Sequence, residues 1–290
     1  MLATSPSTPD AAAEAEPGRP RGWLRRLRRR PELAVGLLIV LVALLASVLA
    51  PILAPYPPDL ANFNVTLAAP GPGHLLGTDN LGRDVLSRLL AGAGSSLLSA
   101  VGAVAMAMAA GTAVGVAAAY LTGRFWDDAL MRIMDAVLAL PPLVLAIAVA
   151  FVLGSGLVNA VLAIAVVFTP SFARLARSKA LQVMQLGYVE AARSVGASTP
   201  RLLARHVVPN ILGPSIAAGV LQVGSAVIIE ASLSFLGLGL APPAPTWGFM
   251  ISSGVTYLQQ APWLVLFPSA AIAVSVFGFT LVGRGLNDWM

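Results

Sequence analysis

Long apolar runs alternate with polar segments along this chain, and six of the runs are of membrane-spanning length. A hydrocarbon core about 30 Å thick needs roughly 20 helical residues, because each residue of an α-helix rises about 1.5 Å. Only helices fit, since a spanning backbone must satisfy its own polar groups. We expect the fourth run, which is short, to extend into the polar stretch after it. The predicted spans are Ala34–Leu53, Ser95–Leu121, Leu130–Leu153, Leu157–Phe172, Leu212–Leu236 and Trp263–Val282.

The composition agrees with an all-α, polytopic membrane protein. Of the 290 residues 57% are hydrophobic and 11% are charged, which is too little charge to coat a water-soluble globule. The mean hydropathy is +0.83. With no Cys and two His, the chain excludes disulfides, thiolate chemistry and a His-built metal site. We therefore expect no catalytic residue, no cofactor and no metal in this chain.

The distribution of positive charge predicts the orientation in the membrane. All 18 Lys and Arg residues except Arg83 and Arg88 lie in or near the N-terminal tail, the second-to-third connection, the polar stretch 170–211 or the C-terminus. The positive-inside rule places those segments, and both termini, in the cytoplasm. The formal charge of +5 could suggest nucleic acid, but the Arg residues flank apolar runs without interleaved aromatic residues. We expect membrane topology, and no nucleic-acid binding, to explain the charge.

Four regions follow from this pattern. Residues 1–32 form a basic cytoplasmic tail, and residues 33–54 form the first transmembrane helix. That apolar run is too long for the core of a cleaved secretory signal, which indicates an uncleaved anchor. Residues 55–92 form an extracytoplasmic loop punctuated by Pro and Gly. Residues 93–290 form the transmembrane core, in which the stretch 170–211 lies in water because its six cations would be costly in lipid.

Within this cytoplasmic stretch the sequence predicts two short helices joined by a glycine corner. The first helix runs through Tyr188–Val195, and Gly196 supplies the left-handed residue that ends it. Thr199 as N-cap, with Pro200 at the first helical position, begins the second helix. We expect that helix to stop before Pro209, because a residue preceding proline is disfavoured in the helical region. The unit would expose Ala191 and Ala192 on one small surface.

The sequence of this stretch resembles that of the cytoplasmic coupling loop of ABC importer permeases. The match covers the Glu-Ala-Ala triplet, a Gly four residues further on, and an apolar pair followed by Pro. Val207 and Val208 stand where Ile and Leu are common, which keeps the apolar character. The resemblance implies that the short helix sits in a groove of an ATPase subunit and transmits its closure to the membrane helices. The residues that it implies for coupling are Glu190, Ala191, Ala192, Arg193, Gly196, Ala197 and Pro209.

A second segment limits the resemblance to a smaller group of these permeases. Gly77-Thr78-Asp79, followed by Gly82-Arg83-Asp84, resembles the segment that precedes the transporter core in permeases for dipeptides, oligopeptides and nickel. From the residues alone we expect a structural lead-in to the second span, with Thr78 or Asp79 as a helix cap and Asp84 and Arg88 as an i,i+4 pair. The resemblance implies a type-I ABC importer (MetI-like) core of five helices with one extra N-terminal helix.

The same resemblance implies the partners of the chain. They are a homologous permease subunit, two ATP-binding subunits that hold ATP and Mg²⁺, and an extracytoplasmic substrate-binding protein. The residues agree that the ATPase must be a separate subunit, because a Walker-type phosphate loop needs Gly-Lys-Ser/Thr. The single Lys of this chain is Lys179, which lies between Ser178 and Ala180.

Two features inside the membrane have open interpretations. Pro141-Pro142 should kink or unwind the third span, and such a kink either lines a pathway or is merely accommodated by neighbouring helices. Glu230 lies well inside the fifth span, where a carboxyl group is costly. It either borders the translocation path or the interface with the other permease, or makes a buried structural hydrogen bond. Gly111 and Gly115 form a Gly-x-x-x-Gly pattern that predicts close helix packing.

Other functional classes fit the sequence less well. A secondary transporter should carry ionisable residues inside the membrane for ion coupling, yet Glu230 is nearly alone there. An intramembrane Ser protease would need a His inside the membrane, but His74 and His206 both lie in loops. The sequence therefore favours the permease of an ATP-driven importer for di- or oligopeptides, with nickel or another small solute left open as the substrate.

Overall fold

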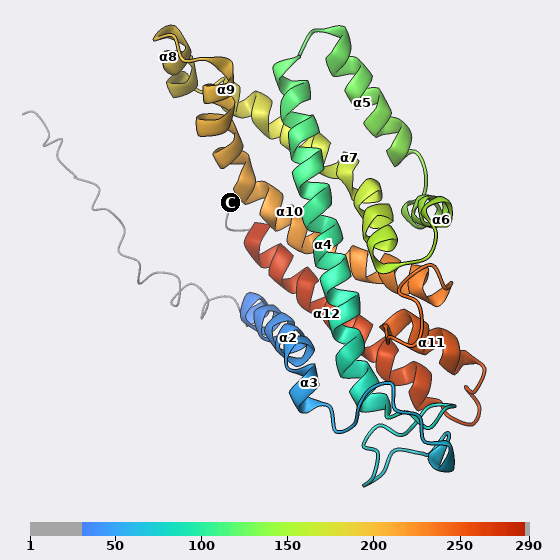
Figure 1. Cartoon of the computed structure of the whole chain (residues 1–290). Helices are drawn as coiled ribbons and strands as arrows, with labels where there is room; N and C mark the ends of the chain where they lie inside the picture. Colours follow the sequence, from blue (N-terminus) through green and yellow to red (C-terminus); the bar gives the residue numbers. More distant parts are fainter. Residues whose placement is uncertain (1–30, 288–290) are drawn as a thin grey trace, which may run out of the picture.

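The computed structural model describes residues 31–287, and within that range the chain is a bundle of helices with loops (Figure 1). Residues 1–30 and 288–290 lie outside the described range, so it contains only the last two residues of the predicted tail. The elements are α2 (Pro31–Val48), α3 (Ala50–Leu53), the 3₁₀ turn η1 (Phe63–Val65), α4 (Val85–Tyr120), α5 (Phe125–Leu138), α6 (Pro142–Leu153), α7 (Leu157–Met184), α8 (Gly187–Ser194), α9 (Thr199–Leu202), the π turn η2 (Leu203–Val207), α10 (Val208–Phe235), α11 (Trp247–Val255) and α12 (Trp263–Asn287).

The described residues confirm an all-α fold of membrane-spanning helices. Five helices of residues 31–287 are long and apolar enough to cross a membrane, or six if α5 and α6 form one broken span. The broken pair corresponds to the predicted third span, and its helices are bent by 97° at the Pro141-Pro142 step. The predicted interruption at these prolines is therefore confirmed.

Two of the helices are much longer than a bilayer requires. α4 has 36 residues, about 54 Å at 1.5 Å per residue, and it begins ten residues before the predicted Ser95. α7 has 28 residues, with Pro170 inside it. It continues past Phe172 to Met184, which confirms the expected extension of the fourth span. Because a bilayer core is about 30 Å thick, both helices must project from it. At this end of the bundle α7 leads into α8, and α9 lies beside the last turn of α4 (Figure 1).

Close packing of α4 on α7 forms the centre of the bundle. A Cβ atom added at Gly111 would lie 2.6 Å from the Cβ of Phe172, and one at Gly115 would lie 2.8 Å from the Cβ of Ala176. Real Cβ atoms do not approach so closely, so the two glycines permit the contact, as the Gly-x-x-x-Gly pattern predicts. The main apolar core surrounds this helix pair.

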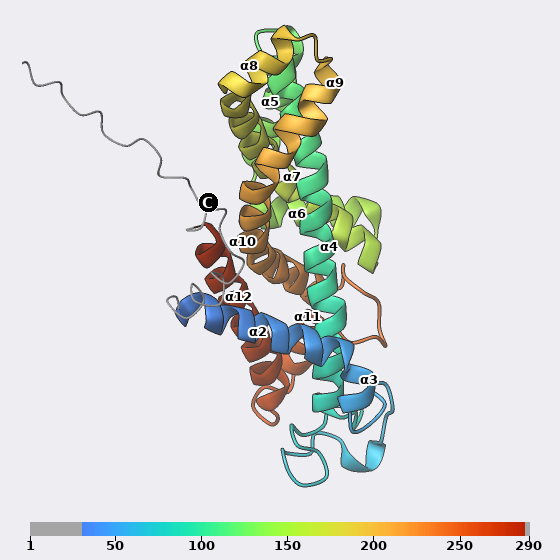
Figure 2. The same cartoon turned by 90° about the vertical axis from the view of Figure 1, so that its left-hand side faces the viewer.

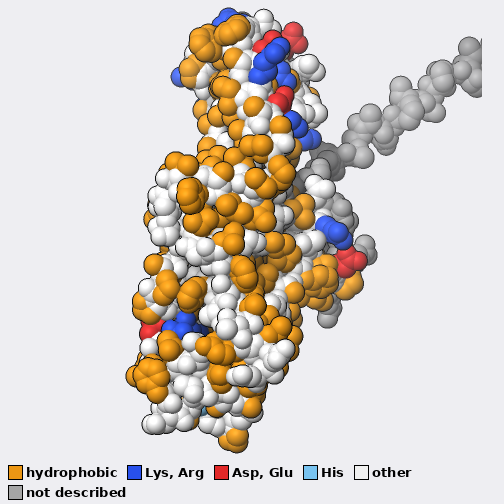
Figure 3. Space-filling view, turned by 90° about the vertical axis from the view of Figure 1, so that its right-hand side faces the viewer, with side chains coloured by type: hydrophobic (Ala, Val, Ile, Leu, Met, Phe, Trp, Pro, Cys, Tyr) orange, Lys and Arg blue, Asp and Glu red, His pale blue; other side chains and the backbone are white. Residues whose placement is uncertain are grey.

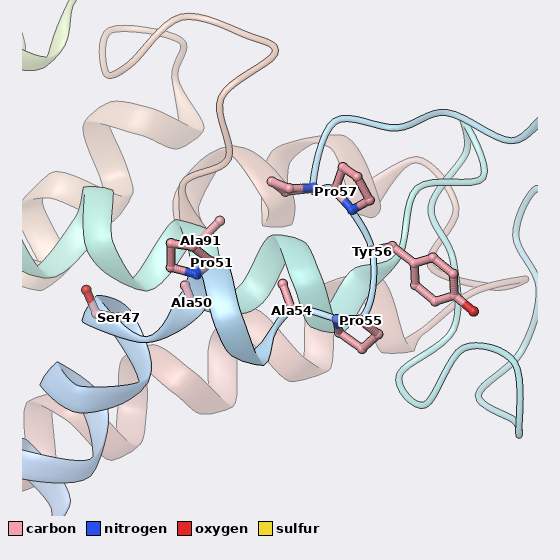
Figure 4. A pocket seen from close by; sticks show the side chains of 9 residues that line it. Ser47, Ala50, Pro51, Ala54, Pro55, Tyr56, Pro57 and Ala91 are labelled. Carbon is pink, nitrogen blue, oxygen red and sulfur yellow. The ribbon is translucent and has the colours of Figure 1, made fainter.

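The first helix packs on the last one. Figure 2 shows α2 beside α12 and across the lower part of α4. A Cβ atom at Gly36 would lie 2.6 Å from the Cβ of Leu281, so this contact also depends on missing side chains. Where α2 gives way to α3, an apolar cavity of about 570 Å³ lies between this segment and α4 (Figure 4). Pro51, Pro55 and Ala91 are among the residues that line it.

The polar stretch differs from the prediction at its second helix. Ser198, not Thr199, is the N-cap of α9, so Thr199 and Pro200 are its first two residues. The prediction that this helix stops before Pro209 is wrong, because α9 continues through the π turn η2 directly into α10. Pro209 lies in the first turn of α10. Because the helical run is continuous, Pro209 lacks one backbone N–H donor, but it follows directly on the π turn, where the i→i−4 hydrogen-bond pattern is already interrupted.

Candidate coupling site

The helix α8 ends in a motif that explains the spacing of its sequence. Gly196 has a φ of +85°, a left-handed conformation that a residue with a Cβ rarely adopts. The backbone N–H of Ala197 donates to the carbonyl of Ala192 at 3.1 Å, and that of Gly196 donates to the carbonyl of Arg193 at 3.0 Å. This pair of hydrogen bonds is a Schellman motif. The predicted first helix and its Gly corner are therefore confirmed.

A separate small apolar core holds this unit on the bundle. We call residues 187–207, from α8 through η2, the coupling unit. The unit contributes the buried residues Val189, Leu202 and Val207 to this core, and they pack with residues of α4 and α7. Ala192 and Ala197, the two ends of the Schellman motif, pack against the same core. The motif thus joins the unit to the two long helices through small side chains.

The remaining residues of the predicted set point outward. Glu190, Ala191, Arg193 and Gly196 are exposed, whereas Ala192 is only partly exposed. Ala192 is less exposed than Ala191 because it also packs against the small core. Pro209 is exposed as well but belongs to α10, beyond the unit. The structure brings Glu190, Ala191, Arg193 and Gly196 together on one short exposed turn.

Charged side chains gather around this end of the bundle. On the face seen in Figure 3 they lie mainly at the upper end, above a broad band of hydrophobic and other uncharged side chains. Arg177 donates two hydrogen bonds to the carboxylate of Asp127, at 2.8 and 2.7 Å. Arg174 donates to Asp135 at 2.7 Å. These two ion pairs tie α5 to α7, just before α7 reaches the coupling unit.

Sequence reasoning missed the role of Arg88 at the opposite end. We call residues 54–84 the loop cap. Arg88 is only 2% exposed, and its guanidinium donates to the carbonyl of Pro58 at 2.9 Å and to the carboxylate of Asp59 at 3.3 Å. It also lies 3.7 Å from Asp79. The predicted pair with Asp84 is wrong, because Asp84 instead contacts His74 at 2.9 Å.

The Gly-Thr-Asp segment is the centre of the loop cap. Asp79 accepts from the side chain of Arg83 at 2.7 Å, and the hydroxyl of Thr78 donates to the carbonyl of Val65. Trp263, at the start of α12, donates to the carbonyl of Thr78 at 3.2 Å. The cap of α4 is neither Thr78 nor Asp79 but Asp84, which accepts from the N–H of Ser87 at 2.8 Å. The segment thus joins the loop cap to α4 and α12.

Glu230 lies in α10, away from the coupling unit, and is 1% exposed. One carboxyl oxygen accepts from the hydroxyl of Ser234 at 2.7 Å, and the other has no partner among the described residues. The hydroxyl of Ser96 lies beside the carboxyl group and accepts from the N–H of Trp247 at 3.2 Å. Glu230 therefore makes a buried hydrogen bond where α4, α10 and α11 meet. Pro141-Pro142 lies at another place, between α5 and α6.

The bundle, its broken third span and its projecting coupling unit define a helical membrane transport protein. A family model described as the binding-protein-dependent transport system inner membrane component matches residues 111–290. A second, described as the N-terminal TM domain of oligopeptide transport permease C, matches residues 21–70. The chain belongs to the family of binding-protein-dependent inner membrane permeases, the permease subunits of ABC importers. Members of this family work with ATPase and binding-protein partners.

Individual relatives and a solved structure agree with this assignment. The chain is 40% identical to the glutathione transport system permease protein GsiD of Pectobacterium atrosepticum over 289 residues, or 99% of this chain and 95% of the relative. It is 42% identical to the probable D,D-dipeptide transport system permease protein DdpC of Escherichia coli, over 80% of this chain and 77% of the relative. An inward-facing structure of the MetNI methionine ABC transporter shares the fold, with a TM-score of 0.57 and 18% identity over 70% of this chain and 96% of that one.

Proposed function

We propose that this chain forms part of the translocation pathway of an ABC importer for peptides or peptide-like solutes, and that α8 couples it to the ATPase. The observation that carries the coupling proposal is the exposed turn of Glu190, Ala191, Arg193 and Gly196, held by a Schellman motif on the long helices α4 and α7. A partner that contacts a rigid exposed turn can displace it, and the helices packed against the turn would then move with it.

The finer composition of the complex follows from the same proposal. One homologous permease would pair with this chain, two ATPase subunits would hold ATP and Mg²⁺, and this chain would hold no cofactor and catalyse no reaction. The coupling unit and both termini would face the cytoplasm, since the unit and the ends of α5 and α7 carry most of the basic residues within 31–287. The loop cap would then face the extracytoplasmic binding protein.

Peptides are favoured by what the relatives are named for, namely glutathione and D,D-dipeptides. Reconstituting the complex with its binding protein, and adding a panel of peptides or nickel, tests this proposal. Peptides should raise the rate of ATP hydrolysis, whereas nickel should not. Stimulation by nickel alone would contradict the peptide assignment and leave the coupling proposal unaffected.

The coupling proposal has its own test at Gly196, where a Cβ would meet nothing within 4 Å. Asn and Asp both tolerate the left-handed conformation better than other side chains, but only Asp adds a charge. Gly196→Asp should insert into the membrane yet lose its bound ATPase subunit, while the matched variant Gly196→Asn should keep it. Co-purification of the ATPase measures both. Normal substrate-stimulated hydrolysis in Gly196→Asp would count against the proposal.

A further inference from the structure

A cavity of about 440 Å³ lies beside the coupling unit, between it and the last turns of α4 and α7. Its deeper wall is apolar, because Val189, Leu202 and Val207 line it and are buried. Its polar lining residues include Gln185 and Arg193, which are exposed and therefore mark its rim. This volume lies within the range of about 300–1,000 Å³ that is typical of pockets that receive a ligand.

The charges of the coupling unit favour an acidic partner. Within the described residues, Arg193, Arg201 and Arg205 of the coupling unit pair with no acidic side chain. Glu190 is the single acidic residue of the unit, so the unit carries a surplus of positive charge. Opposite charges across an interface guide association and exclude wrong partners. A surface that carries carboxylates complements the rim of the cavity.

We propose that this cavity is a socket for an apolar side chain of the ATPase subunit, with a carboxylate of the same subunit paired to Arg193 at the rim. The inference rests on the proposed coupling function and adds a second point of attachment to it. The exposed turn of α8 touches the partner from outside. The socket encloses one apolar side chain of the partner, which contacts α4 and α7 as well as α8.

This attachment has a mechanical consequence. Because the socket walls belong to the unit and to both long helices, an inserted side chain would contact all of them at once. Closure of the ATPase subunits would then displace α4 and α7 directly, as well as through the small core of the unit. α4 and α7 are packed without side-chain bulk at Gly111 and Gly115, so they should move together.

Introduced cysteines provide the test, because the chain has none of its own. Leu203→Cys places a thiol in the wall of the socket. Val195→Cys places one on the outer tip of the unit, where the residue is 86% exposed, and Leu258→Cys places one in the loop after α11. Each variant is reconstituted with and without the ATPase subunit, and the rate of labelling by a thiol reagent is measured on this chain.

Bound ATPase should slow the labelling of Leu203→Cys and of Val195→Cys at least tenfold and leave Leu258→Cys unchanged. Protection of Val195→Cys without protection of Leu203→Cys would overturn the socket while the coupling function stands. Protection of neither would contradict the coupling function itself. If Leu203→Cys is labelled as slowly without the ATPase as with it, an amphiphile or lipid fills the cavity, which also overturns the proposal.

A filling variant gives an independent readout. Leu203→Trp should occupy the socket and weaken binding of the ATPase subunit at least tenfold, whereas Leu186→Trp, an exposed position that does not line the cavity, should change it less than twofold. Equal thermal stability of the two variants without the ATPase excludes a folding defect. Unchanged binding by Leu203→Trp would overturn the socket.

Discussion

The loop cap and the coupling unit are both polar, yet they use their charges in opposite ways. In the loop cap, Asp79 and Asp84 are buried and are satisfied within the chain, Asp79 by Arg83 and Asp84 by a contact with His74. In the coupling unit, Arg201 and Arg205 are exposed and pair with no acidic residue within the described range. α4 begins at the first region and ends beside the second. The comparison teaches that charge in the cap stabilises the fold, whereas charge in the unit remains available to a partner.

Removing Arg88, the cation of α4 that the loop cap surrounds, should have the largest effect. Arg88→Ala leaves the nearly buried carboxylate of Asp79 with one cation fewer and removes the hydrogen bond to Pro58. Because Arg83 still pairs with Asp79, the loss should approach but not exceed the cost of a fully broken buried ion pair, about 3–5 kcal/mol. Thermal unfolding of the purified chain in detergent should show a large fall in Tm. Arg201→Ala is the control from the unit, and an equal fall in both variants would end the distinction between the two regions.

Two glycines with positive φ give the second comparison. Gly82 in the cap has a φ of +71°, and a Cβ there would lie 2.6 Å from the carbonyl carbon of Asn62. Gly196 in the unit has open space around it. Gly196→Ala should therefore cost only the left-handed strain, about 1–2 kcal/mol. Gly82→Ala adds overpacking, for about 2–5 kcal/mol in total. Tm measures both, and a larger loss at Gly196 would contradict the close packing of the cap.

The third prediction compares a buried carboxylate with an exposed one, in the two ion pairs that join α5 to α7 near the coupling unit. Asp127 has a side chain 3% exposed and a two-bond contact with Arg177, whereas Asp135 is 57% exposed beside Arg174. Asp127→Asn should destabilise the chain by about 1.5–3 kcal/mol, because hydrogen bonds to a buried charged group are lost. Asp135→Asn should cost less than about 1 kcal/mol, as exposed pairs do. Comparable Tm values for the two variants would disprove the difference in burial.

The sequence predicts the two regions unequally well. The short helix of the coupling unit and its corner at Gly196 follow from local chemistry, since a Schellman motif needs a left-handed residue at one fixed place. The partial burial of Ala192 and the continuous helix through Pro209 do not, because they depend on the core against α4 and α7 and on the π turn before α10.

The loop cap was harder to predict because its contacts join segments far apart in the sequence. Arg88 contacts Pro58 and Asp59 some thirty residues earlier, and Trp263 contacts Thr78 across 185 residues. No local pattern pairs such residues. One signal was present: Arg83 and Arg88 are the two cations placed on the side opposite the other basic residues, where a structural pairing best explains them.

The smallest effect on stability, and the one that most sharpens the comparison, is expected at the exposed cations of the unit. Arg201→Gln and Arg205→Gln remove charges that pair with no acidic residue of the described chain, so each should change the free energy of unfolding by less than about 0.5 kcal/mol. Each should nevertheless slow association with the ATPase subunit severalfold at low salt, because exposed charges act on encounter. Screening shortens their range to about 3 Å at 1 M salt, so the variants and the parent should then associate at equal rates. A loss of Tm with unchanged association would mean that these cations stabilise the fold, as those of the cap do.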